Sequence, residues 1–292
     1  MKQQGQGALP QAFFLPAGPH SHTAGQRFCL FHPPAGAIQS GRVLYLHPFA
    51  EELNCTRRMV AQQARAMAAA GYAVLQIDLT GCGDSTGDFA DATWNAWLED
   101  AALAHGWLSQ FASGPLWLWG MRSGALLATG LLKTLPEPAN LLLWQPVVNG
   151  QQVLQQFLRL HSAGQWMGAG KSDEQSPSQR LAMGQSVDIA GYTVSPEMAA
   201  SITPASLQPP DTMPQGRLIW IDITKQTDAV LSPSSEQVIS AWRQAGWQTE
   251  TKALVGPSFW QTVSTENAPT LISATLAAML AETFGAETTA RP

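Results

Sequence analysis

The chain has 292 residues, of which 45% are hydrophobic and 13% are charged, and its formal net charge at pH 7 is −5. An average soluble domain has about 25% charged residues, so this composition provides material for a large core and excludes disorder over most of the chain. The acidity is mild and spread along the chain, which argues against a nucleic-acid-binding protein and against a polybasic membrane anchor.

Short β-type runs alternate with longer helical patterns along the chain. Strands are predicted at residues 27–31, 42–47, 73–78, 116–120, 141–145, 217–223 and 249–255. Helices are predicted at residues 56–70, 92–110, 124–135, 234–245 and 270–284, where apolar residues recur at helical spacing. This alternation is typical of a mostly parallel sheet with helices on both faces, so we expect a single α/β domain over residues 1–292. Most of the eleven tryptophans lie in these elements, where we expect them to pack in the core.

The pattern changes between residues 149 and 214. Two short amphipathic helices, at residues 151–160 and 178–183, are separated there by a loop of glycine, serine and lysine at residues 168–176. We expect this helical insert to form a lid over the carboxyl-terminal edge of the sheet, where pockets of open α/β sheets lie. Residues 1–7 and 285–292 are predicted to be loose tails.

The sequence has no stretch that predicts a membrane span or a secretory leader. Its longest apolar runs, residues 125–132 and 141–144, are far shorter than the roughly 18 to 20 residues that a span needs. The first 20 residues contain no apolar core of a signal peptide, and the three cysteines show no disulfide framework. We therefore expect a cytoplasmic protein with no membrane insertion and no nucleic-acid partner.

A strand runs directly into a helix through Gly120, Met121, Arg122, Ser123 and Gly124. This is the pattern of a nucleophile elbow, whose outer glycines permit a sharp turn and close packing. The middle position, however, is Arg122, and a guanidinium is always protonated and cannot attack a carbonyl carbon. Ser123 stands one residue later, which turns its side chain by about 100°, so we expect it to cap the helix or to pack beneath the site.

The order of landmarks resembles that of the α/β-hydrolase superfamily. YLHPFAEELNCTRRM, QIDLTGCGDSTGDF and WLWGMRSGALLA follow or contain the corresponding strands, and a helical insert precedes the last two strands. In detail the chain resembles the exosortase A system-associated hydrolase 2 family, also through QPVVNGQQVLQQFLRL and VDIAGYTVSPEM in the insert. The resemblance covers nearly the whole chain. It implies an α/β-hydrolase fold and a hydrolase or acyl-transfer protein of bacterial systems that couple exopolysaccharide synthesis to protein sorting, with a possible partner in that machinery.

The residues that the resemblance would place in a Ser-Asp-His triad are incomplete. The acid position falls on Asp228, with Asp222 as an alternative, but no histidine follows His161 in the sequence. Where the superfamily has its histidine after the last strand, this chain reads Gly256, Pro257, Ser258, Phe259 and Trp260. A second GxSxG match, at Gly83–Gly87 around Ser85, is not followed directly by a helix and is expected to be a structural loop. We therefore predict that the standard triad is lacking.

The segment after the strand at 42–47 supplies the other candidates. Backbone N–H groups of Phe49 or Ala50, with that of Ser123, are expected to face a developing oxyanion. His47 is a candidate acid or base, although a buried histidine that holds the loop is the more frequent role. One of Glu51 and Glu52 is expected to pair with Arg122, and the sequence does not decide which.

Three kinds of function remain open from these patterns: a hydrolase with an unusual water-activating group, a non-catalytic protein that binds an anionic or acyl ligand, and a structural partner protein. The candidate catalytic residues are Arg122, Ser123, His47 and Asp228. The candidate ligand-binding residues are Arg122, Phe49, Glu51, Glu52 and Trp260. No cluster of histidine and cysteine and no phosphate-binding glycine pattern is present, so we expect no metal and no cofactor.

Overall fold

The computed structural model describes residues 9–18, 24–36, 39–166, 175–211, 216–227, 230–261 and 266–281, and at residues 161–166 it describes the backbone alone. The two predicted tails, residues 1–7 and 285–292, lie outside the described residues. The predicted loop at 168–176 lies mostly outside them as well.

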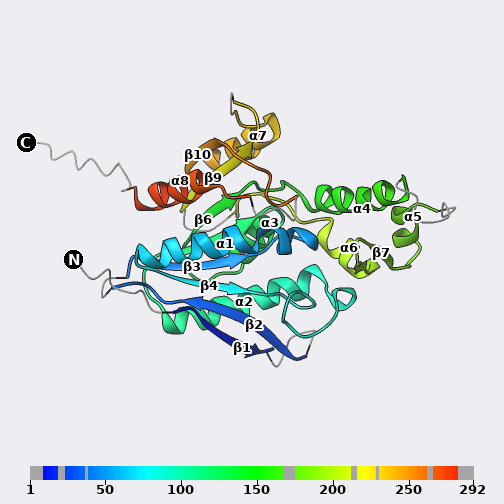
Figure 1. Ribbon diagram of the computed structural model, residues 1–292, viewed down its shortest axis with the longest axis horizontal. Helices are drawn as coiled ribbons and strands as arrows, with labels where there is room; N and C mark the ends of the chain where they lie inside the picture. The colour runs from blue at the N-terminus through cyan, green and yellow to red at the C-terminus, as the bar shows by residue number, and fades with distance from the viewer. Residues whose placement is uncertain are drawn as a thin grey trace, which may run out of the picture.

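An eight-stranded sheet forms the centre of the molecule (Figure 1), in the order β1-β2-β4-β3-β5-β6-β9-β10. The strands are β1 Gln11–Pro16, β2 Gln26–His32, β3 Gly41–Leu46, β4 Tyr72–Ile77, β5 Leu116–Met121, β6 Ala139–Trp144, β9 Arg217–Thr224 and β10 Gln248–Val255. β2 is antiparallel to both β1 and β4, and the other pairings are parallel. The predicted mostly parallel sheet is therefore confirmed.

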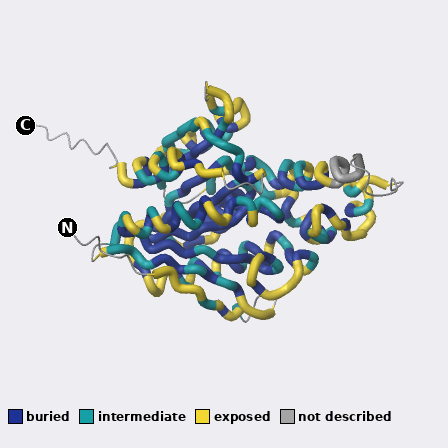
Figure 2. Tube along the Cα trace, in the orientation of Figure 1, coloured by how far each residue is buried: buried dark blue, intermediate teal, exposed yellow. Residues whose placement is uncertain are grey.

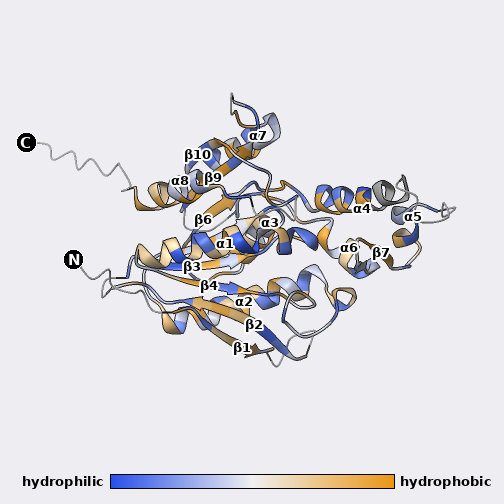
Figure 3. Cartoon of the chain, in the orientation of Figure 1, coloured by the Kyte–Doolittle hydropathy of each residue, from blue (hydrophilic) through white to orange (hydrophobic). Residues whose placement is uncertain are grey.

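Helices cover both faces of this sheet because the central strands are apolar on both sides. In β3, Val43 and Tyr45 face one core, whereas Leu44 and Leu46 face the other. The first core is completed by α1 (Glu51–Ala69) and α8 (Pro269–Leu280), the second by α2 (Trp94–Phe111), α3 (Gly124–Leu132) and α7 (Pro233–Gln244). Figure 2 shows the buried residues concentrated in this central region, and Figure 3 shows the apolar character of the same strands.

Helix α1 begins at Glu51, five residues before the predicted start at residue 56. Glu51 and Glu52 occupy its first turn, where carboxylates are favoured by the partial positive charge of a helix N-terminus. The helical apolar spacing begins only after these residues, so it did not reveal them. This correction places both glutamates directly after the loop that follows β3.

The segment between β6 and β9 contains α4 (Gly150–Trp166), α5 (Pro177–Ala182), β7 (Val187–Ile189), β8 (Tyr192–Val194) and α6 (Pro196–Ile202). We call it the insertion. In Figure 1 its elements lie together at one end of the central sheet. The insert was expected to be helical, and the structure adds to its helices a separate two-stranded hairpin of β7 and β8, outside the central sheet.

The β7–β8 hairpin and strand β1 escaped the sequence patterns for different reasons. The turn of the β7–β8 hairpin uses positive φ at Ala190 and Gly191, and alanine is not a residue that signals such a turn. β1 is an edge strand in which only Leu15 is buried, so it lacks an apolar face that alternates along the strand. Among the described residues, no helix is long and apolar enough to cross a membrane.

Candidate functional site

The turn from β5 into α3 holds the central residue of the site in a strained conformation. Arg122 has a φ of 54°, in the left-handed region that non-glycine residues seldom adopt. Its backbone N–H donates to the carbonyl of Trp144 at 3.0 Å, and its carbonyl accepts from Val147 at 3.3 Å. Neighbouring strand ends thus hold Arg122 at the apex of the turn.

The two outer glycines of the elbow leave room for this turn. A Cβ atom on Gly124 would lie 2.1 Å from the carbonyl oxygen of Leu46, and one on Gly120 would lie 2.5 Å from Cα of Ala125. Both contacts are with backbone atoms that cannot move independently. The pattern read from the sequence therefore corresponds to a true close approach of α3 to the sheet.

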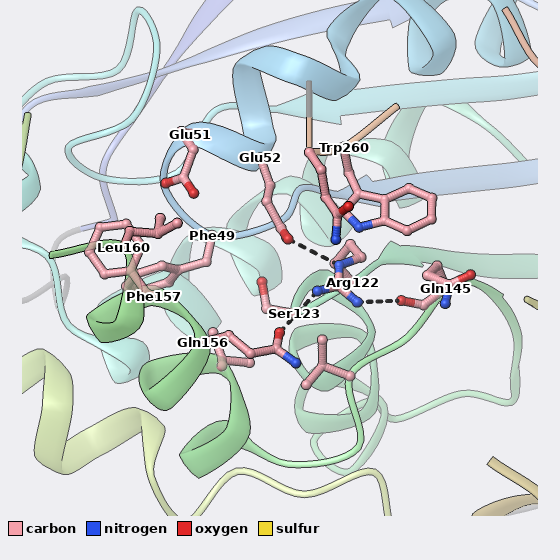
Figure 4. Close-up of a pocket in the computed structure, with 13 residues that line it drawn as sticks. Phe49, Glu51, Glu52, Arg122, Ser123, Gln145, Gln156, Phe157, Leu160 and Trp260 are labelled. Atoms are coloured by element: carbon pink, nitrogen blue, oxygen red, sulfur yellow. Dashed lines mark hydrogen bonds and ion pairs between the residues drawn. The ribbon is translucent and has the colours of Figure 1, made fainter. Parts of the chain in front are cut away.

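A cavity of about 510 Å³ opens at this apex (Figure 4). Its walls come from the loop after β3, the first turn of α1, the elbow, the loop after β6, helix α4 of the insertion, and the segment after β10. The lining residues are Phe49, Glu51, Glu52, Arg122, Ser123, Gln145, Val147, Val153, Gln156, Phe157, Leu160, Trp260 and Gln261. Six of the predicted site residues are thus gathered around one cavity.

Arg122 is held by acceptors from three separate elements. Its Nε donates to Oε1 of Glu52 at 3.1 Å, one terminal nitrogen donates to Oε1 of Gln156 at 3.0 Å, and the other donates to the carbonyl of Gln145 at 3.4 Å. The guanidinium also lies 5.6 Å from the ring centroid of Trp260. Its ion pair with Glu52 decides the question that the sequence left open.

The two glutamates have different roles although they are adjacent. Burial raises the pKa of Glu52, and the nearby positive charge of Arg122 opposes that rise. Burial also raises the pKa of Glu51, which has no comparable cation. Oε2 of Glu51 is buried without a hydrogen-bond partner among the described residues. One carboxylate oxygen of Glu51, a residue of the cavity wall, is therefore without a partner.

Ser123 does not cap α3, which was one of the two roles expected for it, the other being to pack beneath the site. Ser123 is 1% exposed, and its side chain makes no capping hydrogen bond. The Oγ atom has no hydrogen-bond partner within the described part of the chain. In Figure 4 the hydroxyl points into the cavity, and the glutamates project from the start of α1 on the opposite side. The expected 100° rotation thus directs the side chain into the cavity, below the apex.

His47 lies behind the loop and does not line this cavity. Its Nδ1 pairs with the carbonyl of Pro48 at 2.8 Å, and its Nε2 accepts from the backbone N–H of Leu79 at 3.2 Å. Burial lowers its pKa, which favours the neutral ring. Both ring nitrogens are engaged with backbone groups, so His47 holds the loop after β3 in place.

The remaining candidates are dispersed. Asp228 lies outside the described residues. Asp222 accepts from Nε1 of Trp220 at 2.8 Å and from Oγ of Ser235 at 3.0 Å, and burial raises its pKa. Ser85 donates to the carbonyl of Asp78 and accepts from the N–H of Phe28, so this serine braces a loop, as predicted.

Several lining residues were not predicted from the sequence. Gln145 follows β6 with a φ of 43°, and its Oε1 accepts from the N–H of Ile223. Gln156 and Phe157 come from α4. A polar residue directly after a central strand is a usable signal for Gln145, whereas nothing in the local pattern of α4 distinguishes Gln156 from its glutamine neighbours. Among the described residues, no group of three or more potential metal ligands is found.

Comparisons with known proteins agree with this architecture. The family model described as serine aminopeptidase, S33, matches residues 39–188. No protein of curated function matches the chain in sequence.

Solved structures with low sequence identity share the fold. An α/β serine hydrolase without a lid from Xanthomonas campestris is 16% identical, with a TM-score of 0.53 over 92% of this chain and 93% of that chain. Est1E from Butyrivibrio proteoclasticus, with bound ferulic acid, is 12% identical, with a TM-score of 0.59 over 92% and 98%. The α/β-hydrolase GrgF from Penicillium sp. sh18 is 12% identical, with a TM-score of 0.58 over 93% and 98%. The family match spans about half of the chain and includes the elbow, so this protein has the α/β-hydrolase fold and belongs to the serine aminopeptidase S33 family of α/β-hydrolases.

Proposed function

We propose that this protein binds a small ligand in the cavity at the elbow and does not hydrolyse it through an activated serine. The observation that carries the proposal is the position of Arg122 at the apex, with its guanidinium bound to Glu52, Gln156 and the carbonyl of Gln145. A guanidinium at that position cannot form an acyl-enzyme bond.

The rest of the site supports the same proposal. Ser123 lies one position past the apex, and no histidine follows residue 161 in the sequence to act as its base. His47 has both ring nitrogens bound to backbone atoms. Asp222 is bound by Trp220 and Ser235, so it accompanies no imidazole there. A conventional Ser-Asp-His relay is therefore not part of the proposed function.

The ion pair between Arg122 and Glu52 also limits the charge of the ligand that the cavity can bind. If the guanidinium were free, the elbow would suit an acidic ligand, because the start of α3 adds a partial positive charge. Glu52 already accepts from Arg122, however, and Glu51 adds a second carboxylate to the cavity wall. An anion would have to displace Glu52 and approach Glu51, so we propose a ligand that is not an anion.

We place the binding protein in a bacterial exopolysaccharide and protein-sorting system, on the strength of the motifs that resemble the exosortase A system-associated hydrolase 2 family. In this proposal the chain is one cytoplasmic domain whose insertion serves as the lid of the cavity. Disruption of the coding sequence in the host, followed by measurement of secreted polysaccharide, tests the link. Restoration of secretion by the Arg122→Ser variant as well as by the original chain would argue against a role for the elbow.

Reaction with a fluorophosphonate probe tests the absence of an activated serine. We expect no stoichiometric labelling of Ser123 or Ser85, either in the original protein or in Arg122→Ser, because the variant supplies a hydroxyl at the apex but no imidazole base. Mass spectrometry of intact protein measures the adduct. Labelling of Ser123 in the original protein would overturn the proposed function.

An alternative function, water activation by the Glu51 carboxylate, predicts ester hydrolysis that is lost in Glu51→Gln without any covalent adduct.

A further inference from the structure

Three buried polar atoms that have no hydrogen-bond partner in the described part of the chain belong to residues that line the same cavity. They are Oγ of Ser123, Oε2 of Glu51 and Nε1 of Trp260. Ser123 is 1% exposed and Trp260 is 4% exposed, so bulk solvent does not reach these side chains freely. This grouping joins the elbow, the first turn of α1 and the segment after β10.

Such atoms are uncommon in folded proteins, because a buried donor or acceptor that finds no partner loses its hydration without compensation. The other atoms of this kind in the described part of the chain belong to Arg42, Tyr45, Gln63 and Trp119, which do not line the cavity. The three residues that carry these atoms share one cavity wall, so a molecule bound in that cavity is one source of partners for all three atoms.

The charges of the lining exclude an anionic molecule. The cavity wall contains two carboxylates, those of Glu51 and Glu52, and one guanidinium, that of Arg122. The guanidinium is already paired with Glu52. The remaining charge on the wall is negative and belongs to Glu51.

The three atoms differ in the hydrogen bonds that they can form. An ionised carboxylate accepts only, an indole N–H donates only, and a serine hydroxyl does both. An ammonium group has donors only, so it would satisfy Glu51 but leave Trp260 without an acceptor. Hydroxyl groups both donate and accept, so neighbouring hydroxyls on one ligand can satisfy all three atoms. The apolar part of the wall, from Val153, Phe157 and Leu160 of α4, suits the C–H faces of such a ligand.

We propose that the cavity binds a neutral molecule with neighbouring hydroxyl groups, a monosaccharide unit or a related polyol, through Ser123, Glu51 and Trp260. The cavity volume of about 510 Å³ lies within the range of small-molecule sites and accommodates a ligand of this size. This inference rests on the proposed ligand-binding function, and it adds the chemical class of the ligand and the residues that recognise it.

Isothermal titration calorimetry at pH 7 with a panel of neutral probes tests the inference: methyl α-glucoside, methyl α-galactoside, methyl α-mannoside, glycerol and myo-inositol. We expect saturable binding of at least one probe. We also expect glucuronate to bind at least about tenfold more weakly than the neutral glucoside, because its carboxylate meets Glu51. Ser123→Ala and Glu51→Gln should each weaken binding of that probe by about three- to tenfold or more. The matched controls Ser178→Ala and Glu197→Gln, at exposed positions outside the cavity, should leave it unchanged.

Thermal denaturation of each variant shows whether it remains folded, so a weaker affinity in a folded variant supports the inference. Failure of all five neutral probes to bind at about 10 mM overturns it, as does tighter binding of glucuronate than of the neutral glucoside. Binding of butylammonium without binding of any polyol overturns it too. Labelling of Ser123 by a fluorophosphonate overturns the proposed function separately, whatever the sugar panel shows.

Discussion

The Nε atom of Arg122 lies 3.1 Å from Oε1 of Glu52, which joins the apex of the elbow to the first turn of α1. The two side chains are 12% and 20% exposed, so solvent screens the pair only in part. The pair links residues 70 positions apart at the point where the family places its nucleophile.

Removal of the Arg122 charge should destabilise the protein. Arg122→Met leaves the carboxylate of Glu52 without its cation in a largely buried place, so we expect a loss of about 2 to 4 kcal/mol in the free energy of unfolding. Urea denaturation measures this loss. Glu52→Gln should have a smaller effect in the Arg122→Met background than in the original protein, because the interaction is already broken.

Lys133→Met, at an exposed position after α3, is the control and should change stability by less than about 0.5 kcal/mol. Equal effects of Arg122→Met and Lys133→Met would contradict a stabilising pair.

Gly124→Ala should be strongly destabilising. The added Cβ meets the carbonyl oxygen of Leu46 at 2.1 Å, so α3 or β3 must move. We expect a loss of more than about 3 kcal/mol, or no folded protein, as judged by circular dichroism during thermal denaturation. Gly106→Ala is the control, because this glycine lies on an exposed part of α2 where nothing stands within 4 Å of an added Cβ. The control should gain about 0.5 to 1 kcal/mol from helix propensity. A neutral Gly124→Ala would show that the close approach is absent.

Ser123→Ala should not destabilise the ligand-free protein. The hydroxyl is buried and has no partner in the described residues, so its removal takes away a desolvation cost and no protein hydrogen bond. We expect the free energy of unfolding to stay constant or to rise by up to about 1 kcal/mol. Thr275→Val provides the contrast, because Oγ1 of Thr275 accepts from Nε1 of Trp144 at 3.0 Å and its loss leaves a buried N–H unpaired. That variant should lose about 1 to 3 kcal/mol. A large loss in Ser123→Ala would mean that its hydroxyl has a protein partner.

The Glu51→Gln variant should gain stability relative to the original protein as the pH rises. Burial raises the pKa of Glu51 above its ordinary value of about 4.3, so the folded state holds the proton more tightly than the unfolded state. The stability contributed by this group is complete below that ordinary value and is lost as the pH rises through the raised value. Glutamine does not titrate, so the difference in melting temperature, variant minus original, should increase between pH 4 and pH 7. A constant difference between Glu51→Gln and the original protein over this pH range would contradict the raised pKa.

Strand and helix placement followed from local patterns because central parallel strands are apolar on both faces and the flanking helices bury one face. The predictions were least accurate where this alternation is weak. Strand β1 buries only Leu15, and the β7–β8 hairpin consists of three-residue strands joined through Ala190 and Gly191. Strand β1 packs through Phe13 on Trp107, and β8 contacts the short helix Phe89–Asp91, and local periodicity does not record contacts of this kind.

The sequence by itself determined that an arginine stands at the apex of the elbow and that no histidine follows residue 161, because both depend only on residue order around recognisable strand and helix patterns. Only the tertiary structure decided which groups surround Arg122. Glu51 and Glu52 are neighbours, but a helix turns by about 100° per residue, so the placement of α1 against the sheet directs Glu52 to the guanidinium and leaves Glu51 without a cation. Gln156 reaches Arg122 from α4, 34 residues away, and the fold turns His47 toward backbone atoms behind the loop. Contacts of this kind depend on how separate elements pack together, and residue order does not specify those distances.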